Sequence, residues 1–239
     1  MKRALVTGGS GGIGAAVCRR LAADGLHVCV HGHRNGEAAQ ALVAEIAAAG
    51  GSASAVMFDV ADAAATGAAL ATLLAEGPIQ VIVNNAGIHD DAVFPAMRAE
   101  QWRSVIDVSL NGFFNVTQPL LLPMLRTRWG RVVNVTSVAA IAGNRGQVNY
   151  AAAKGALHSA TKSLALEVAS RGVTVNAVAP GIIDTGMTAA TFDVDAIERL
   201  VPMKRAGRPD EVADLIGFLC SDRAGYITGQ VVSINGGII

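Results

Sequence analysis

The stretch RALVTGGSGGIGAAVCRRLAADG, residues 3–25, contains an apolar run, a glycine-rich turn and an amphipathic segment in immediate succession. This pattern predicts a strand over 3–8 and a helix over 11–25 that ends at Gly25. Glycines between a strand and a helix let the backbone approach a ligand closely, and the helix N-terminus favours an anion. The stretch therefore predicts the first β-α unit of a sheet that binds a phosphate-containing ligand.

The same alternation of short apolar runs and longer amphipathic segments continues along the sequence. Further strands are expected at 27–32, 52–60, 79–87, 131–138, 173–180 and 230–236. Further helices are expected at 35–50, 62–76, 99–126, 149–170 and 209–220. Continuous apolar strands that alternate with helices are typical of a parallel sheet covered on both faces. We therefore predict an α/β fold, a Rossmann-like doubly wound parallel sheet of about seven strands with helices on both faces.

Composition and charge narrow the class of protein. The sequence is 51% hydrophobic and 16% charged, which suits a heavily buried α/β protein and excludes a disordered chain. Its 19 basic and 19 acidic side chains give no basic excess, so no nucleic-acid partner is expected. No linker or compositional break divides the sequence, and we expect a single domain over 1–239 with a flexible flap at about 183–207.

The sequence also indicates a compartment. Cys18, Cys29 and Cys220 are odd in number and scattered among apolar residues, so we expect small core side chains in a reducing environment. No apolar run is long enough to span a bilayer, and the first residues reach glycine too early for a signal peptide. We expect a cytoplasmic protein without a membrane partner.

The second strand indicates which dinucleotide the turn binds. The turn reads T-G-x-x-x-G-x-G over 7–14, which is wider than the common G-x-G-x-x-G fingerprint. An acid at the end of the next strand would bind the adenosine ribose, but VHGHRN (30–35) offers His33 and Arg34 instead. Arg34 supplies a cationic fork suited to a 2′-phosphate, and its alternative is an ordinary loop arginine. NADPH is favoured over NADH.

Two polar residues of the helix at 149–170 suggest catalysis. Tyr150 and Lys154 are four residues apart and lie on one helix face. The lysine charge is expected to lower the pKa of the phenol, which would make it a proton donor and acceptor. Ser137 ends the fifth expected strand at the edge where open α/β sheets bind ligands. Without Ser137, the pair would be interpreted as part of an exposed polar stripe.

Four motifs together carry a family resemblance. TGGSGGIG (7–14), NNAG (84–87), the Tyr150-x-x-x-Lys154 pair and PGIIDT (180–185) resemble the short-chain dehydrogenase/reductase family over essentially the whole chain. GNRGQVNYAAAKGAL and EVASRGVTVNAVAPGIIDTGMT resemble 3-oxoacyl-acyl-carrier-protein reductases most closely, including the ketoreductases of aryl-polyene-type pathways.

The resemblance implies roles for the catalytic residues. Ser137 would hydrogen-bond the substrate carbonyl, Tyr150 would protonate the developing alkoxide, and Lys154 would also hold the nicotinamide ribose. Family members usually carry Asn where this sequence has Ser109, and Asn111 lies too far around the helix to replace it. Because Ser109 still donates and accepts a hydrogen bond, we expect a working but slower proton relay.

The resemblance also implies a cofactor site and a partner. Arg128 and Arg171 match positions that dock an acidic carrier protein, although both would also fit an ordinary surface. No metal site is expected. The residues implied for cofactor binding are Gly8, Ser10, Gly12, Ile13, Gly14, His33, Arg34, Asp59, Val60, Asn85, Ala86, Gly87, Tyr150, Lys154, Pro180, Gly181, Ile183 and Thr185.

The expected activity is NADPH-dependent reduction of a 3-oxoacyl thioester, linked to acyl carrier protein or coenzyme A, in fatty-acid or related polyene and polyketide synthesis. Two alternatives remain open. One is a dehydrogenase of another small ketone or alcohol. The other is a weakly active nucleotide-binding subunit of a partner reductase, suggested by Ser109. A homotetramer is expected by resemblance.

Overall fold

A parallel β-sheet forms the centre of the molecule. The computed structural model describes residues 1–185 and 194–239, and within them the sheet has seven strands in the order β3-β2-β1-β4-β5-β6-β7. The strands are β1 (Arg3–Val6), β2 (His27–Gly32), β3 (Ser52–Met57), β4 (Val81–Asn84), β5 (Gly130–Val135), β6 (Val173–Pro180) and β7 (Val231–Ile234). The predicted fold class is confirmed.

The strand order creates the place where a ligand binds. The chain proceeds outward from β1 to β3 and then crosses back, so that β4 pairs with the other side of β1. Val6 of β1 pairs with Val30 of β2 and with Val83 of β4. Because the connections from β1 and β4 leave in opposite directions, a crevice opens at the carboxyl ends of these two strands.

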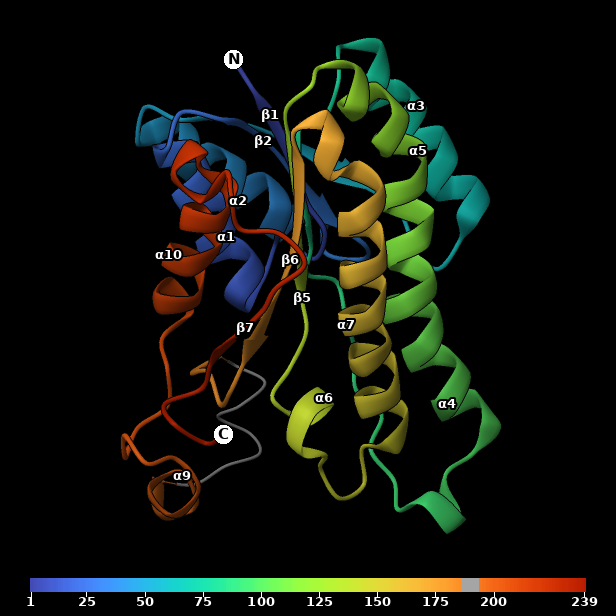
Figure 1. The fold of residues 1–239 in the computed structure, drawn as a ribbon, viewed down its shortest axis with the longest axis vertical. Helices are drawn as coiled ribbons and strands as arrows, with labels where there is room; N and C mark the ends of the chain where they lie inside the picture. Colours follow the sequence, from blue (N-terminus) through green and yellow to red (C-terminus); the bar gives the residue numbers. More distant parts are fainter. Residues whose placement is uncertain (186–193) are drawn as a thin grey trace.

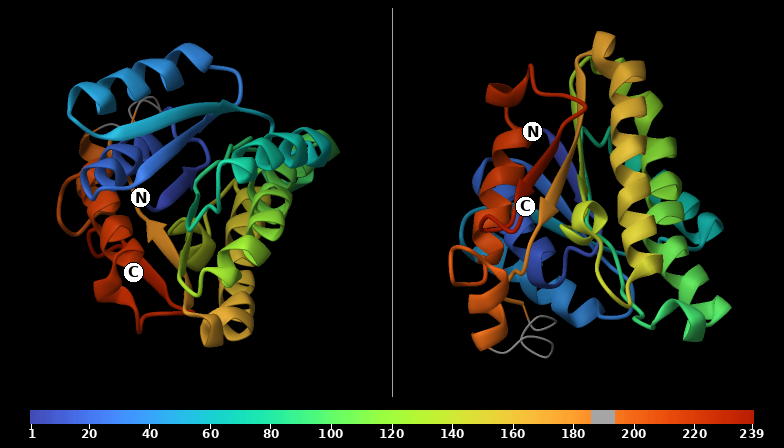
Figure 2. Two further views of the ribbon diagram at one scale, coloured as in Figure 1. Left: turned by 90° about the horizontal axis from the view of Figure 1, so that it is seen from above. Right: turned by 60° about the horizontal axis from the view of Figure 1, so that its bottom comes forward.

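Helices cover both faces of the sheet (Figure 1). One layer contains α1 (Gly12–Ala23), α2 (Gly36–Ala48) and α10 (Pro209–Cys220). The other contains α3 (Ala63–Ala75), α4 (Ala99–Ile106), α5 (Gly112–Arg126) and α7 (Val148–Val168). The two further views in Figure 2 show the same two layers, with the short helices α6 (Ala139–Ala142) and α9 (Val194–Leu200) beyond one edge of the sheet.

The side chains of the continuous apolar strands pack into two separate hydrophobic cores, one on each face of the sheet. Val6 and Val30 pack into the core beneath α1 and α10, whereas Leu5 and Cys29 pack into the core beneath α3 and α5. Alternate residues of a strand point to opposite faces, so a strand covered on both sides has no polar face.

Two helices of this framework begin at side-chain caps that the sequence places there. The Asn35 side chain accepts from Ala38 N at the start of α2, and Asp62 accepts from Ala64 N and Ala65 N at the start of α3. Each cap satisfies amide groups that the first turn of a helix leaves without a partner.

Several predicted boundaries are wrong. The helix expected at 99–126 is interrupted by a π-helical segment, Asp107–Asn111, which separates α4 from α5. The strand expected at 131–138 ends at Val135, and helix α6 follows in a segment where none was predicted. The strands expected at 52–60 and 79–87 are likewise shorter than predicted.

The flap expected at 183–207 lies partly outside the described residues, at 186–193, and α9 occupies part of the remainder. None of the helices in the two described ranges combines the length and the apolar character needed to cross a membrane.

Candidate active site

A cavity of about 600 Å³ opens at the carboxyl edge of the sheet. Loops that follow β1, β4, β5 and β6 form its wall, together with the first two turns of α7. Most of the predicted site residues line it. They are Gly8, Ser10, Gly12, Ile13, Asn85, Ala86, Gly87, Ser137, Tyr150, Lys154, Pro180, Gly181, Ile183 and Thr185.

The glycine-rich turn is packed so closely that larger side chains do not fit. A Cβ atom at Gly14 would lie 2.1 Å from the carbonyl oxygen of Gly8. Gly8 itself has φ = 61°, a conformation that a residue with a side chain rarely adopts. Gly14 therefore lies behind the cavity wall and lets α1 approach the turn, with the N-terminus of α1 directed at the cavity.

A buried histidine that the sequence analysis missed holds this turn in place. His31 of β2 accepts a hydrogen bond at Nδ1 from the Gly8 amide, 3.0 Å away, and its Nε2 lies 3.0 Å from the Phe58 carbonyl oxygen. An acceptor at Nδ1 and a donor at Nε2 require a neutral ring. Burial lowers the pKa of His31 to about 4, which agrees with that state. The signal in the sequence was a histidine between apolar residues and glycine at the end of strand HVCVHG (27–32).

Asn85 connects β1 to β4 at the same edge. Its amide donates to the carbonyl oxygens of Thr7 at 2.9 Å and Gly8 at 3.0 Å. The Thr7 hydroxyl in turn accepts from the amides of Asn85 and Ala86, each at 3.0 Å. These bonds join the loops that follow β1 and β4, and Gly8, Asn85 and Ala86 line the cavity there.

Tyr150 and Ser137 meet inside the cavity. Ser137 lies two residues beyond the end of β5 and lines the same cavity as the Tyr150 phenol. Burial raises the pKa of Tyr150, against a smaller lowering by the neighbouring Ser137 hydroxyl. This direction is the opposite of the one expected from the lysine charge, because desolvation of the phenolate is the larger effect in the chain alone.

Lys154 is buried behind this pair. Its side chain is 3% exposed, and Nζ donates to the Val135 carbonyl oxygen at 2.9 Å. The ammonium lies 5.9 Å from the centre of the Tyr150 ring. Burial lowers the pKa of Lys154 to about 8, so its charge is held against a considerable desolvation cost.

Ser109 faces the same space as Lys154. A Cβ atom at Gly87 would lie 3.0 Å from Lys154 Nζ and 3.5 Å from Ser109 Oγ. Ser109 Oγ is buried and has no hydrogen-bond partner among the described residues. Asn111 donates to Asp107 Oδ1 on the exposed side of the helix, as expected for a residue that does not replace Ser109. Ser109 belongs to the π-helical segment and lies beside Gly87 and Lys154, which line the cavity, and such segments are frequent at functional sites.

The remaining predicted cofactor residues lie outside the cavity wall. His33 Nε2 is 3.6 Å from Asp59 Oδ2, and Val60 is buried against α5 at Gly112. Arg34 is exposed beyond the end of β2, and it forms no ion pair within the described parts of the chain.

Arg128 and Arg171 lie at the other edge of the sheet. Arg128 precedes β5 and Arg171 precedes β6, whereas the cavity lies where these strands end. The six residues of β5 alone separate the two edges by about 20 Å.

Comparison with known proteins agrees with this arrangement. The sequence model described as short chain dehydrogenase matches residues 2–195. A 3-oxoacyl-acyl-carrier-protein reductase of Synechocystis is 47% identical over 238 residues, covering 99% of this chain and 96% of the relative. The nodulation protein G of Azospirillum brasilense is 44% identical, covering 99% of this chain and 98% of the relative. A 3-oxoacyl-acyl-carrier-protein reductase of Staphylococcus aureus is 43% identical with the same coverage.

Proposed function

The chain belongs to the short-chain dehydrogenase family, and we propose that it reduces a 3-oxoacyl thioester to the 3-hydroxyacyl product with NADPH. The observation that carries this proposal is that Ser137, Tyr150 and Lys154 converge on one cavity that also contains the glycine-rich turn. The substrate class is supported by relatives such as the Synechocystis and Staphylococcus aureus enzymes, whose names state that reaction.

The cavity fits a dinucleotide. Its volume of about 600 Å³ is in the range of cofactor sites, and the cradle around Gly8 and Gly12 leaves backbone exposed at the N-terminus of α1. When bound, NADPH supplies the hydride. Arg34 would hold the 2′-phosphate, because it is an exposed cation at the end of β2 without a carboxylate partner among the described residues.

Residues of the chain would supply the proton that the substrate oxygen takes up during the reduction. The Ser137 hydroxyl and the Tyr150 phenol both line the cavity and can donate to one carbonyl oxygen. A raised pKa keeps Tyr150 protonated, and therefore ready to donate to the alkoxide as it forms. The phenolate that remains lies near the Lys154 ammonium, whose charge stabilises it until a proton returns.

The carrier would dock away from the cavity. We propose that an acidic acyl carrier protein binds at Arg128 and Arg171, in agreement with the carrier named in the relatives. The arginines and the cavity lie at opposite ends of β5, about 20 Å apart. The acyl group would therefore reach the cavity on a long flexible arm of the carrier, or it would enter the cavity of a second copy of this chain.

A homotetramer is part of the proposal. Phe114 and Leu122 on α5 and Leu166 on α7 are 61%, 59% and 86% exposed, which is unusual for large apolar side chains on two adjacent helices. Sedimentation of the purified chain measures the assembly directly.

NADPH consumption with an acetoacetyl thioester tests the activity. We expect Tyr150→Phe to reduce kcat by about 10³-fold, because it removes the proton donor without changing the ring. Tyr226→Phe is the matched control, since Tyr226 is the second of the two tyrosines in the sequence and is fully exposed. Full activity of Tyr150→Phe would refute this mechanism.

Substrate panels separate the alternatives. Turnover of other small ketones without turnover of thioesters would indicate a different dehydrogenase of the same family. Tight NADPH binding without turnover of any ketone would indicate a nucleotide-binding partner subunit, the alternative suggested by Ser109.

A further inference from the structure

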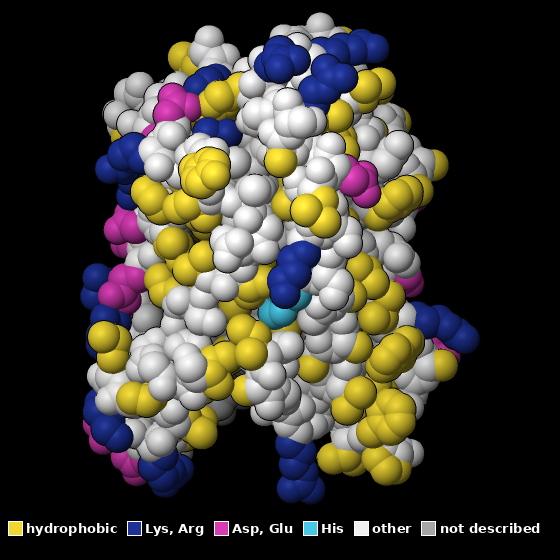
Figure 3. All heavy atoms as spheres, in the orientation of Figure 1, with side chains coloured by type: hydrophobic (Ala, Val, Ile, Leu, Met, Phe, Trp, Pro, Cys, Tyr) yellow, Lys and Arg dark blue, Asp and Glu magenta, His cyan; other side chains and the backbone are white. Residues whose placement is uncertain are grey.

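The edge of the sheet opposite the cavity presents exposed arginines. Arg126 ends α5, Arg128 follows it, and Arg171 ends the short 3-10 helix after α7. All three are exposed, and none forms an ion pair with a described residue. Figure 3 shows Lys and Arg side chains gathered at this end of the molecule, where Asp and Glu are few. A surface of unpaired arginines attracts an acidic partner.

The two turns that carry Arg128 and Arg171 are in direct backbone contact. The Gly130 amide donates to the Gly172 carbonyl oxygen at 3.3 Å. A Cβ atom at Gly172 would lie 2.4 Å from the Arg128 carbonyl oxygen, and Gly172 has φ = 73°. Arg128 itself has φ = 53°, which is uncommon for a residue with a side chain and persists where surrounding contacts impose it.

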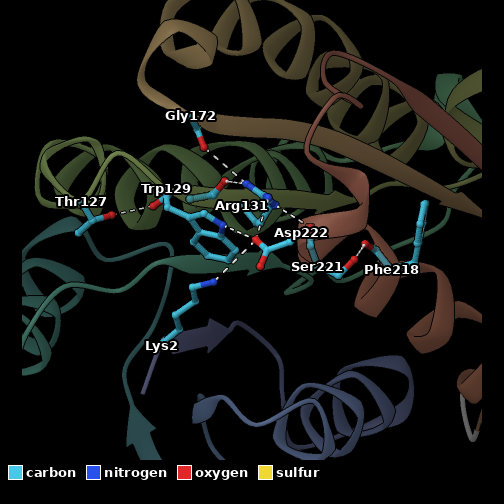
Figure 4. Close-up of polar contacts among 9 residues, drawn as sticks. Lys2, Thr127, Trp129, Arg131, Gly172, Phe218, Ser221 and Asp222 are labelled. Carbon is cyan, nitrogen blue, oxygen red and sulfur yellow. Dashed lines mark hydrogen bonds and ion pairs between the residues drawn. The ribbon is translucent and has the colours of Figure 1, made fainter.

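Trp129 supplies contacts that impose this conformation (Figure 4). Its indole Nε1 donates to Asp222 Oδ1 at 2.7 Å, and the Thr127 hydroxyl donates to its carbonyl oxygen at 2.7 Å. Lys2 Nζ lies 3.6 Å from the indole centre, and the Arg131 guanidinium carbon lies 4.4 Å from it. An aromatic ring contacted by two cations and hydrogen-bonded at its edge has little rotational freedom.

Arg131, which packs against Trp129, joins the segments around β5, β6 and α10 by hydrogen bonds. Its guanidinium is buried and donates to the carbonyl oxygens of Gly130 at 2.8 Å and Ser221 at 3.2 Å. A longer bond, at 3.5 Å, joins it to the Gly172 carbonyl oxygen. The turn of Arg128 and the turn of Arg171 are therefore attached to one buried cation, and Trp129 covers that cation.

We infer that Trp129 is a positioning residue for carrier recognition, which holds Arg128 and Arg171 as a preformed pair of cations for an acidic carrier protein. The inference rests on the proposed function. Because the two turns are ordered before the carrier arrives, binding loses less conformational entropy than it would with mobile arginines. Trp129 acts through the arginines, and it lies at the opposite edge of the sheet from the reacting atoms.

Two substrates separate recognition of the carrier from catalysis. The KM and kcat of NADPH-dependent reduction are measured with acetoacetyl-acyl carrier protein and with acetoacetyl-coenzyme A. We expect Trp129→Ala to raise KM for the carrier substrate by about tenfold and to leave both constants for the coenzyme A substrate within about twofold. Trp129→Phe keeps a ring between the cations and loses the bond to Asp222, so its increase in KM should be smaller.

A double-mutant cycle tests whether Trp129 acts through the arginines. We expect Arg128→Glu with Arg171→Glu to raise KM for the carrier substrate, and the addition of Trp129→Ala to raise it no further. Arg103→Glu on α4 is the control, since it changes the net charge away from these turns. An equal increase from Arg103→Glu would indicate recognition by overall charge and would overturn the inference.

The outcomes distinguish this inference from the proposed function. Equal losses of kcat on both substrates from Trp129→Ala would indicate a purely structural role for the indole. A normal KM for the carrier substrate in the Arg128→Glu, Arg171→Glu enzyme would refute carrier docking at these arginines. It would not contradict the proposed reductase activity. Failure of the wild-type chain to reduce either thioester would refute the proposed function and the inference with it.

Discussion

Two buried cations lie at opposite ends of β5, and they are surrounded very differently. Arg131 and Lys154 are each 3% exposed. Arg131 donates to three carbonyl oxygens, pairs with Asp222 at 3.7 Å and packs against Trp129. Lys154 donates to one carbonyl oxygen, that of Val135, and no described carboxylate pairs with it.

This difference in hydrogen-bond partners indicates that Arg131 is a structural cation and Lys154 a functional one. A buried charge stabilises a fold when its donors are satisfied, as those of Arg131 largely are. Lys154 has three N–H donors and uses one on a described residue, and the Ser109 hydroxyl beside it has no described partner. Because Lys154 lines the cavity, its remaining donors are available to a ligand, and we expect the end of β5 near Lys154 to be the reactive one.

Replacement of Lys154 should have the largest effect. We expect Lys154→Met to reduce kcat/KM by about 10³-fold, because it removes the cation that stabilises the Tyr150 phenolate. Its thermal stability should be equal to or higher than that of the wild type, since an apolar side chain replaces a desolvated charge. Steady-state kinetics and thermal denaturation measure the two effects. A fall in stability would show that the charge supports the fold.

Replacement of Arg131 should give the reverse result. We expect Arg131→Met to lower the free energy of unfolding by about 3 kcal/mol, because three carbonyl oxygens lose a charged donor. For a chain of this length, that corresponds to a decrease in Tm of about 6 to 12 °C. Turnover of a coenzyme A thioester below the new Tm should remain close to that of the wild type. A loss of turnover without a loss of stability would contradict the comparison.

The pH dependence of stability should reveal the depressed pKa of Lys154. Its pKa is about 8 in the folded chain and 10.5 unperturbed, so the unfolded chain binds more protons between these values. Stability therefore rises with pH through this range, and the destabilisation of about 3 kcal/mol that is complete below pH 8 is progressively relieved above it.

The difference in unfolding free energy between wild type and Lys154→Met isolates this contribution from other titrating groups. The measurement requires denaturant titrations from pH 7 to pH 10. A constant difference over that range would mean that the folded-state pKa is not depressed.

Replacement of Ser109 should have the smallest effect. We expect Ser109→Ala to reduce kcat by less than about tenfold and to raise stability by up to about 1 kcal/mol, since a buried hydroxyl without a described partner is removed. Ser109→Asn restores the residue expected from the family and should equal or exceed the wild-type kcat. Identical kinetics for all three proteins would exclude Ser109 from the proton relay.

The sequence predicted much of the fold and of the cavity wall. Short apolar runs located every strand of the described sheet, because residues buried on both faces have no polar alternation. The glycine-rich turn, Ser137, Tyr150 and Lys154 were located by their motifs and meet in the cavity. The π-helical segment at Asp107–Asn111 was missed, since its apolar spacing is the same as that of a continuous helix.

The electrostatics of the site could not be predicted in the same way. Tyr150 was expected to have a lowered pKa from the four-residue spacing to Lys154, but burial raises it. The sequence analysis assigned no role to His31, which accepts a hydrogen bond from the Gly8 amide in the folded chain. Both results depend on neighbours that are brought together from distant parts of the chain.

What the sequence determined alone is the alternation of strands and helices and the kinds of reactive group, because periodicity and side-chain identity are local properties. Tertiary structure decided which polar atoms remained available. Arg131 and Lys154 look equally cationic in the sequence, yet Arg131 donates to the carbonyl oxygens of Gly130, Gly172 and Ser221, whereas Lys154 lines a cavity. Desolvation and hydrogen-bond satisfaction depend on every group packed around a charge, and only the folded chain assembles those groups.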